Sequence, residues 1–261
     1  AQIAASTIIA VLADFRLDDL HGFLGIHQMP YALSLLVTIV GCTFVSNAFN
    51  LIDGIDGLAG TMAVICTFFL GFAFIITGNY SPAVISFSLM GAIVGFLRFN
   101  YHPARIFMGD SGSLVIGFVI AVLAIVLTDK VRHFEGNMLF HSARAVLLGA
   151  LSLLFIPVFD TFRVFTMRII KGKSPFAADR THLHHFLLDL GFSHTKTVII
   201  IALCSLGIIG ITFMIQDYPV NICLLVVLFS ACSLFALLYF IRRTRLNGAE
   251  EPGRKKNKLI L

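Results

Sequence analysis

About seven long apolar runs, separated by short polar loops, follow one another along the 261-residue chain. Only 13% of the residues are charged, roughly half the share found in soluble globular domains. A soluble fold would need far more polar surface than this sequence provides, so the bilayer is the solvent in which these runs can be buried. The sequence therefore predicts an all-α, polytopic membrane protein.

Several of the predicted spans are shorter than the roughly 20 residues that a crossing helix needs, so we expect their ends to extend into the flanking polar motifs. The apolar stretch Ala1–Ala13 is too short to cross and is interpreted as the remnant of an N-terminal helix. Residues 1–246 are expected to form one multi-helix membrane domain, and 247–261 a basic cytoplasmic tail. The predicted spans are Tyr31–Val45, Leu58–Thr77, Pro82–Leu97, Leu114–Thr128, Ala143–Phe159, Thr197–Ile215 and Val220–Ile241.

Positive charge is divided unevenly between the two sets of loops. When loops are assigned to alternate sides, all but four of the 19 Lys and Arg residues fall on one side, the exceptions being Arg16, Lys130, Arg132 and Arg144. The positive-inside bias assigns the richer side to the cytoplasm. The net charge of +5 then describes a basic cytoplasmic face, which suits an anionic lipid or an anionic substrate. Three polar motifs fall on this same face.

The five cysteines lie in apolar runs and include no Cys-x-x-Cys pair. Cysteines in such surroundings behave as small hydrophobic residues. We therefore expect neither a disulfide framework nor a cysteine-bound metal.

The first polar motif, NAFNLIDGIDGLAG, occupies Asn47–Gly60 between two apolar runs. Residues three apart on a helix share a face, so we expect one polar face formed by Asn50, Asp53 and Asp56. Glycines at the same spacing, Gly54, Gly57 and Gly60, would leave a strip beside the acids where a ligand lies close to the backbone. The alternative is a helix end with capping acids and glycine-mediated packing. Ionisable groups at membrane depth are costly, which favours a functional role.

The second motif, Phe107–Ser113, places Asp110 among small residues just before an apolar run. Backbone N–H groups at a helix start attract phosphate. The Asp110 carboxylate would offer a hard oxygen ligand to a Mg²⁺ ion that bridges phosphate oxygens. An Asp N-cap followed by flexible glycines explains this motif equally well.

The third motif places His182, His184 and His185 after Arg180 in the most basic loop. No Cys or nearby Glu completes a zinc ligand set. We expect a cationic, hydrogen-bonding patch for a pyrophosphate, with a solvated polar loop as the alternative. Asp160, at the end of an apolar run, is expected to pair with Arg163 or Arg168.

Together the motifs would supply acids suited to Mg²⁺, a basic site for an anion, and a face open to both cytoplasm and lipid. They suit the transfer of a phosphoryl-linked group from a soluble donor to a lipid acceptor. A transporter of an anionic solute would also need intramembrane charges, but the sequence shows no inverted repeat. A catalytically inactive membrane protein that only binds a nucleotide-sugar is a further alternative.

Taken in order, the three motifs resemble those of the polyprenyl-phosphate N-acetylhexosamine-1-phosphate transferases, which are related to phospho-N-acetylmuramoyl-pentapeptide transferase. The first motif matches the family pattern as Asn47-x-x-Asn50-x-x-Asp53-Gly54-x-Asp56-Gly57-Leu58. Phe107–Ser113 matches its Met-Gly-Asp-x-Gly-Ser motif. His182-x-His184-His185 looks like the variant of the N-acetylglucosamine-type enzymes, whereas the peptidoglycan relative usually carries three consecutive histidines.

The resemblance implies a reaction between a UDP-N-acetylhexosamine, taken as UDP-GlcNAc, and undecaprenyl phosphate. The products would be an undecaprenyl-diphospho-sugar and UMP, the first step of a cell-wall or lipopolysaccharide glycan pathway. It further implies a bacterial inner-membrane enzyme with its active site on the cytoplasmic face, compatible with a homodimer and without a nucleic-acid partner.

The resemblance also implies roles for individual residues. The carboxylates taken as catalytic are Asp53, Asp56 and Asp110. Mg²⁺, or Mn²⁺ in its place, would be bound by Asp110 with Asn50 as a second ligand. The uracil and ribose pocket would be lined by Asn100, Gly54, Ile55, Asp56 and Phe107, with Phe107 stacking on the base. The donor's pyrophosphate or sugar would be held by Arg180, His182, His184 and His185.

The chain departs from the family pattern at its front. The family carries an upstream Asp-Asp motif at the cytoplasmic end of an earlier helix, whereas Asp18-Asp19 is expected on the opposite side. The match begins after the true motif, so we expect the C-terminal part of a longer enzyme. We therefore expect that these 261 residues alone do not turn over, while nucleotide binding persists.

Overall fold

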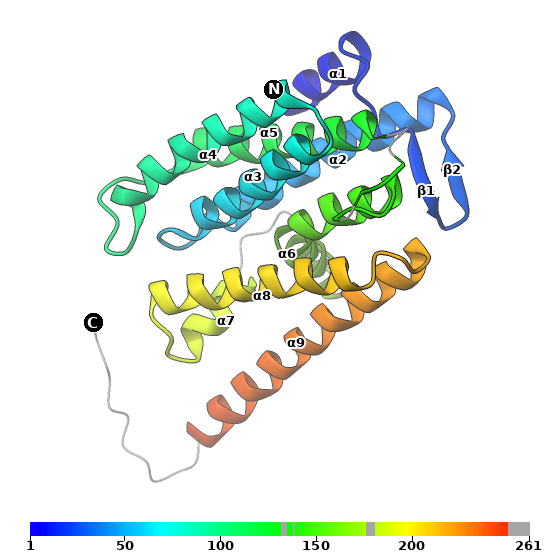
Figure 1. Ribbon diagram of the computed structural model, residues 1–261. Helices are drawn as coiled ribbons and strands as arrows, with labels where there is room; N and C mark the ends of the chain where they lie inside the picture. Colours follow the sequence, from blue (N-terminus) through cyan, green and yellow to red (C-terminus); the bar gives the residue numbers. More distant parts are fainter. Residues whose placement is uncertain (132–134, 138, 176–180, 250–261) are drawn as a thin grey trace.

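The computed structural model describes residues 1–131, 135–137, 139–175 and 181–249. These residues form an almost wholly helical bundle with one two-stranded hairpin (Figure 1). Within these described ranges, seven helices are long and apolar enough to cross a membrane, which confirms the predicted all-α polytopic architecture. The helices are α1 Gln2–Leu12, α2 Tyr31–Leu51, α3 Leu58–Ile76, α4 Tyr80–Asn100, α5 Gly109–Lys130, α6 Ala143–Ile170, α7 Leu183–Asp189, α8 His194–Met214 and α9 Val220–Ala249.

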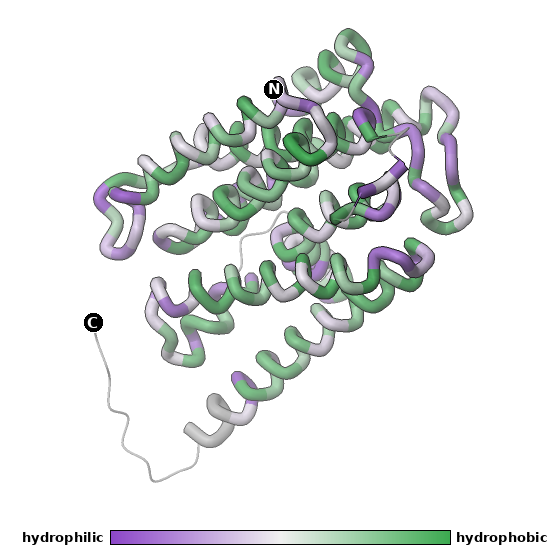
Figure 2. The backbone as a smooth tube through the Cα atoms, viewed as in Figure 1, coloured by the Kyte–Doolittle hydropathy of each residue, from purple (hydrophilic) through white to green (hydrophobic). Residues whose placement is uncertain are grey.

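Apolar colour runs along the lengths of the helices in Figure 2, and hydrophilic colour gathers at loops and helix ends. Helix α2 continues to Leu51, past the predicted end at Val45, and α5 begins at Gly109 instead of Leu114. Helix α6 continues to Ile170 although Pro157 lies inside it. A helix satisfies its own backbone hydrogen bonds, so it can continue through a polar segment at membrane depth. The polar side chains on it are then covered by other parts of the protein. The prediction that the spans extend into the polar motifs is confirmed.

The segment between α1 and α2 forms a hairpin that the sequence did not predict, with strands β1 Asp19–Phe23 and β2 Ile26–Gln28. Gly22 in β1 and Gly25 between the strands adopt left-handed conformations, which glycine does at no steric cost. The backbone N–H of Leu24 donates to Asn221 Oδ1 at 2.9 Å, which ties the hairpin to α9. Since the 21-residue α2 rises about 31 Å between the hairpin and the first motif, Asp18 and Asp19 lie far from it.

All five cysteines are free thiols. Cys66 and Cys223 are buried and donate to backbone carbonyls, Leu153 O at 3.3 Å and Ile215 O at 3.0 Å. They pack as small interior residues.

Helices α2 and α5 approach each other closely at Gly117. A Cβ atom added there would lie 2.7 Å from Phe49 Cβ and 2.9 Å from Ser46 Cα. The Ser46 hydroxyl also donates to Leu114 O at 2.7 Å across the same interface. This contact holds the end of α2, which carries the first motif, against the start of α5, which carries the second.

We expect Gly117→Ala to destabilise the protein by about 1–3 kcal/mol, because backbone atoms of α2 cannot move aside as a flexible side chain can. Thermal unfolding in detergent measures the effect. The matched control is Gly95→Ala in α4, where an added Cβ meets nothing within 4 Å and alanine favours the helix. Equal melting temperatures for the two variants would show that the α2–α5 contact is not tight.

Candidate active site

The first motif does not form one helical face. Helix α2 ends at Leu51, and residues 52–57 form the turn that leads into α3. Gly57, the N-cap residue of α3, adopts a left-handed conformation with φ of +80°, which a continuous helix does not allow. Asn50 therefore lies on the last turn of α2, while Asp53 and Asp56 lie in the turn and point to different partners. The expectation of a shared helix face was wrong for this reason.

The expected side-chain-free strip is filled by the protein itself. A Cβ atom on Gly54 would lie 2.6 Å from His184 Nε2, and one on Gly60 would lie 2.7 Å from Leu97 Cδ2. A Cβ on Gly57 would meet the Tyr101 ring at 3.3 Å. The glycines allow the side chains of His184, Leu97 and Tyr101 to approach, so the surface that was expected to be open is covered by the protein.

Asn50 and Asp110 join the first two motifs. The Asn50 Nδ2 donates to Asp110 Oδ1 at 3.0 Å and to Ser113 Oγ at 2.9 Å. Asp110 lies exposed in the first turn of α5, and the helix begins at Gly109, so Asp110 is not the N-cap residue. The amide nitrogen, and not the oxygen, of Asn50 faces Asp110. An Asn50 oxygen ligand beside Asp110 would require the amide to turn by about 180°.

Asp53 lies close enough to Asp110 for the negative charge of Asp110 to affect its ionisation. Burial, with a further contribution from the negative charge of Asp110, raises the pKa of the Asp53 carboxyl to about 6, although Gly109 N–H donates a hydrogen bond to it. The two carboxylates provide hard oxygen donors, which Mg²⁺ prefers, and the Asn50 amide oxygen would join them only after the amide turns. A divalent cation would also relieve the repulsion between the two carboxylates. The residues present fit the predicted Mg²⁺ site.

We expect Asp53→Asn to raise the melting temperature at about pH 7.5 when divalent cations are chelated. The pKa of Asp53 is higher in the folded protein than its ordinary value of 3.8, so folding favours the protonated form, and stability falls as the pH rises from about 4 through 6. Asparagine does not ionise, so the variant does not lose stability in this way as the pH rises. Near pH 4 the parent and the variant should unfold at similar temperatures. A lower melting temperature for Asp53→Asn at both pH values would contradict this account.

Asp56 has different partners, two histidines and a backbone N–H. Its Oδ2 lies 2.7 Å from His102 Nδ1, accepts from Ala104 N–H at 3.2 Å, and lies 3.7 Å from His194 Nδ1. Burial opposes ionisation, but the hydrogen bonds from His102 and Ala104 outweigh it and lower the pKa of the carboxyl. Asp56 is therefore ionised at neutral pH and held by the α4–α5 loop.

The residues expected around the nucleotide lie in different surroundings. The Asn100 side chain is buried, with Oδ1 accepting from Gly57 N–H at 3.0 Å and Nδ2 donating to Ile106 O at 2.9 Å. It braces the first-motif turn against the α4–α5 loop. Ile55 is packed in the core, whereas Phe107 is 77% exposed and free to stack. The nucleotide pocket itself stays a prediction.

Asp160 holds the third motif in place. Its carboxylate lies 2.9 Å from His182 Nδ1, accepts from Leu183 N–H, and forms an ion pair with Arg163 at 2.7 Å. Arg163 also donates to Thr181 O. Asp160 is 3% exposed, so this ion pair is buried, and the expected pairing with Arg163 is confirmed. With His182 Nδ1 turned to Asp160, the Nε2 atom is the one left for a ligand.

His184 is buried against Gly54. Burial, with a further contribution from the charge of His185, lowers the pKa of His184 to about 3. Its Nε2 forms no hydrogen bond within the described residues. His184 is therefore neutral and cannot supply the positive charge expected of it. Arg180, the fourth residue expected at this site, lies outside the described residues.

One cavity of about 620 Å³ unites the first and third motifs. One part of its wall is polar and is formed by Thr43, Asn47, Asn50, Asp53, Gly54, Arg168, His182, His184 and His185. The rest is apolar and is formed by Ile3, Ile39, Val40, Phe44, Leu51 and Phe165. Ile3 and Val40 are exposed on the outside of the bundle, so the cavity opens on the lipid-facing surface. Asp110 joins it through Asn50, whereas Asp56 lies outside its lining.

Comparison with known proteins agrees with the motifs. Residues 1–128 match the model of glycosyl transferase family 4. A decaprenyl-phosphate N-acetylglucosaminephosphotransferase from Mycobacterium tuberculosis is 37% identical over 191 residues, which cover 70% of this chain and 47% of the relative. The chain belongs to glycosyl transferase family 4.

Other relatives of this family 4 protein match over a similar extent. A probable undecaprenyl-phosphate N-acetylglucosaminyl 1-phosphate transferase from Bacillus subtilis is 35% identical over 175 residues, 67% of this chain and 45% of the relative. An undecaprenyl-phosphate alpha-N-acetylglucosaminyl 1-phosphate transferase from Escherichia coli is 28% identical over 211 residues, 78% of this chain and 54% of the relative. The chain spans about half the length of the curated relatives it matches. The family resemblance drawn from the motifs is confirmed.

The sequence prediction gave no site role to three residues that belong to this family 4 site. Asn47 and Arg168 line the cavity, and Asp160 fixes His182. Arg168 is buried within α6 and donates to Pro175 O. An arginine and an aspartate on one apolar helix are themselves a signal, since buried ionisable groups in a membrane helix are costly and usually functional.

Proposed function

We propose that this chain carries the donor and acceptor sites of a transferase that moves GlcNAc-1-phosphate from UDP-GlcNAc to a polyprenyl phosphate, releasing UMP. The site would face the cytoplasm from the bacterial inner membrane, as the distribution of Lys and Arg suggests. The names of the relatives supply the sugar and the lipid phosphate. UDP as the donor's carrier follows from the family.

The observation that carries the proposal is the divided wall of the cavity. Its apolar part opens on lipid between α1, α2 and α6, where a prenyl chain would be buried without leaving the membrane. Its polar part holds Asn50 at the end of α2, Asp53 in the turn that follows and His182 just before α7. A lipid whose headgroup must meet a soluble nucleotide-sugar needs such a boundary.

The polar groups suit phosphoryl transfer, which depends mainly on positioning and charge neutralisation. Mg²⁺, held by Asp110 and Asp53, would neutralise phosphate charge. Arg168 supplies a fixed positive charge at the cavity wall. His182, oriented by Asp160, would direct Nε2 to a phosphate or sugar oxygen. Neutral His184 would serve as a hydrogen-bonding group and not as a cation.

Gly54→Ala tests the proposal at the contact between two motifs. The added methyl group would displace the His184 ring from its present position, so we expect UDP-GlcNAc affinity to fall at least about tenfold. Equilibrium binding of radiolabelled UDP-GlcNAc to the purified chain with Mg²⁺ provides the measurement.

The matched control for Gly54→Ala is Gly41→Ala in α2, where an added Cβ meets nothing within 4 Å. It should bind the donor like the parent, and both variants should keep their helical content. Unchanged donor affinity in Gly54→Ala, or the absence of saturable UDP-GlcNAc binding in the parent, would contradict the proposed function.

A further inference from the structure

Asp56, His102 and His194 come together from three separate segments of the chain. Asp56 lies in the α2–α3 turn, His102 in the α4–α5 loop, and His194 is the first residue of α8. One ligand atom from each residue lies within 4.8 Å of the other two. None of the three lines the cavity described above.

The spacing of these atoms is close to that of a metal site. Ligand atoms bonded at about 2.0–2.1 Å to a tetrahedral zinc ion lie about 3.3 Å apart. Asp56 Oδ2 lies 2.7 Å from His102 Nδ1 and 3.7 Å from His194 Nδ1, values on either side of that distance. The side chain of His102 is 46% exposed, so its ring has room to adjust.

His194 supplies an independent indication. Its Nδ1 atom is buried and forms no hydrogen bond within the described part of the chain, although it faces the Asp56 carboxylate. A buried polar atom without a partner costs free energy. A cation between His194 and Asp56 would satisfy that nitrogen and the carboxylate together.

We propose that Asp56, His102 and His194 form a site for a divalent transition-metal ion such as Zn²⁺. Two imidazoles and one carboxylate are ligands that zinc and its first-row neighbours accept, whereas Mg²⁺ prefers oxygen donors throughout. The site shares no ligand with the Mg²⁺ site proposed at Asp110 and Asp53. The inference does not depend on the transferase activity, because it concerns binding of the metal alone.

A bound ion would join the α2–α3 turn, the α4–α5 loop and the start of α8. Because such an ion binds the folded protein and not the separated segments, it should raise the melting temperature. Its effect on stability can therefore be measured without substrate.

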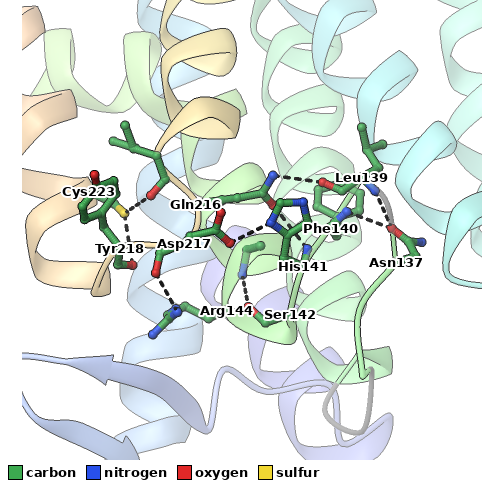
Figure 3. A network of polar contacts seen from close by, with 12 residues as sticks. Asn137, Leu139, Phe140, His141, Ser142, Arg144, Gln216, Asp217, Tyr218 and Cys223 are labelled. Carbon is green, nitrogen blue, oxygen red and sulfur yellow. Dashed lines mark hydrogen bonds and ion pairs between the residues drawn. The ribbon is translucent and has the colours of Figure 1, made fainter.

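The opposite end of the bundle offers a matched control. His141 Nδ1 and Asp217 Oδ1 are also 2.7 Å apart, and the His141 side chain is 45% exposed. Figure 3 shows this pair within its network of polar contacts. This pair has no third metal-ligating side chain among the described residues. The His141–Asp217 pair therefore has the same kind of His–Asp contact as His102 and Asp56 but lacks a third ligand.

The test is a titration of the purified, untagged chain with Zn²⁺ in the presence of excess Mg²⁺. Binding is measured by calorimetry, and the change in stability by the melting temperature. Co²⁺ in place of Zn²⁺ would report imidazole ligation through its visible absorption. We expect one saturable site in the parent. His102→Gln and His194→Gln should each weaken it by at least about 10- to 100-fold, the loss that removing even an outer partner of a metal ligand causes. His141→Gln should bind zinc like the parent.

Several outcomes would overturn the proposal. Equal affinity in the parent, His102→Gln and His194→Gln would show that these side chains are not ligands. Loss of binding in His184→Gln alone would place the ion in the third motif instead. The absence of saturable binding by a parent protein with native helical content would show that the cluster is only a hydrogen-bonded contact.

Discussion

Asp160→Ala is expected to lower the free energy of unfolding by about 3–5 kcal/mol, the usual cost of removing one partner from a buried ion pair. The carboxylate is 3% exposed and satisfies Arg163, His182 Nδ1 and the backbone N–H of Leu183. Its loss leaves a buried guanidinium without its counter-ion and frees His182 to rotate. Donor binding should therefore fall together with stability. Reversible unfolding in mixed micelles and UDP-GlcNAc binding measure the two effects.

Asp217→Ala is the matched control, since Asp217 also pairs with a histidine, His141, but its side chain is 68% exposed. An exposed pair contributes about 0–1 kcal/mol. The double variant Asp160→Asn with Arg163→Gln removes both buried charges and should recover part of the lost stability. A loss below about 1 kcal/mol in Asp160→Ala would show that water reaches the network and that it does not hold the third motif.

Asp110→Asn is expected to remove the Mg²⁺ dependence of donor binding while the protein stays folded. Asp110 is exposed at the start of α5, so the substitution leaves no buried group unpaired. It removes one of two carboxylates whose proximity favours a divalent cation. We expect the Mg²⁺-dependent gain in UDP-GlcNAc affinity to fall by at least about 10- to 100-fold.

Asp217→Asn makes the same change of charge at the opposite end of the bundle and should leave the Mg²⁺ effect intact. Titration of Mg²⁺ at fixed UDP-GlcNAc concentration compares the two variants. Undiminished Mg²⁺ dependence in Asp110→Asn would assign the cation to other ligands.

Membrane architecture was predictable because apolar length depends on bilayer thickness and not on tertiary detail. The hairpin β1–β2 was not, since five- and three-residue strands carry little periodicity. The polar motifs were found because carboxylates and histidines are rare beside membrane spans. Their spacing alone could not show that α2 ends at Leu51 and that Asp53 and Asp56, in the turn that follows, have different partners.

Charge states were the least predictable part of the site. His184 belongs to a basic loop in the sequence, yet packing against Gly54 buries it and makes it neutral. Asn100 is a polar residue of a kind that often binds ligands, but both the oxygen and the nitrogen of its amide form hydrogen bonds with backbone groups. Such outcomes depend on contacts between segments far apart in the chain, which a spacing pattern does not contain.

The most direct test of the central claim is to map where a lipid phosphate binds. A polyprenyl phosphate with a photoreactive group on the isoprene unit next to the phosphate would be irradiated with the purified chain in nanodiscs, and labelled peptides identified by mass spectrometry. The account predicts labels at residues 39–44 of α2 and near Phe165 of α6, displaced by unlabelled polyprenyl phosphate. Labels on the outer faces of α4 or α9, or labels that competitor does not displace, would contradict it.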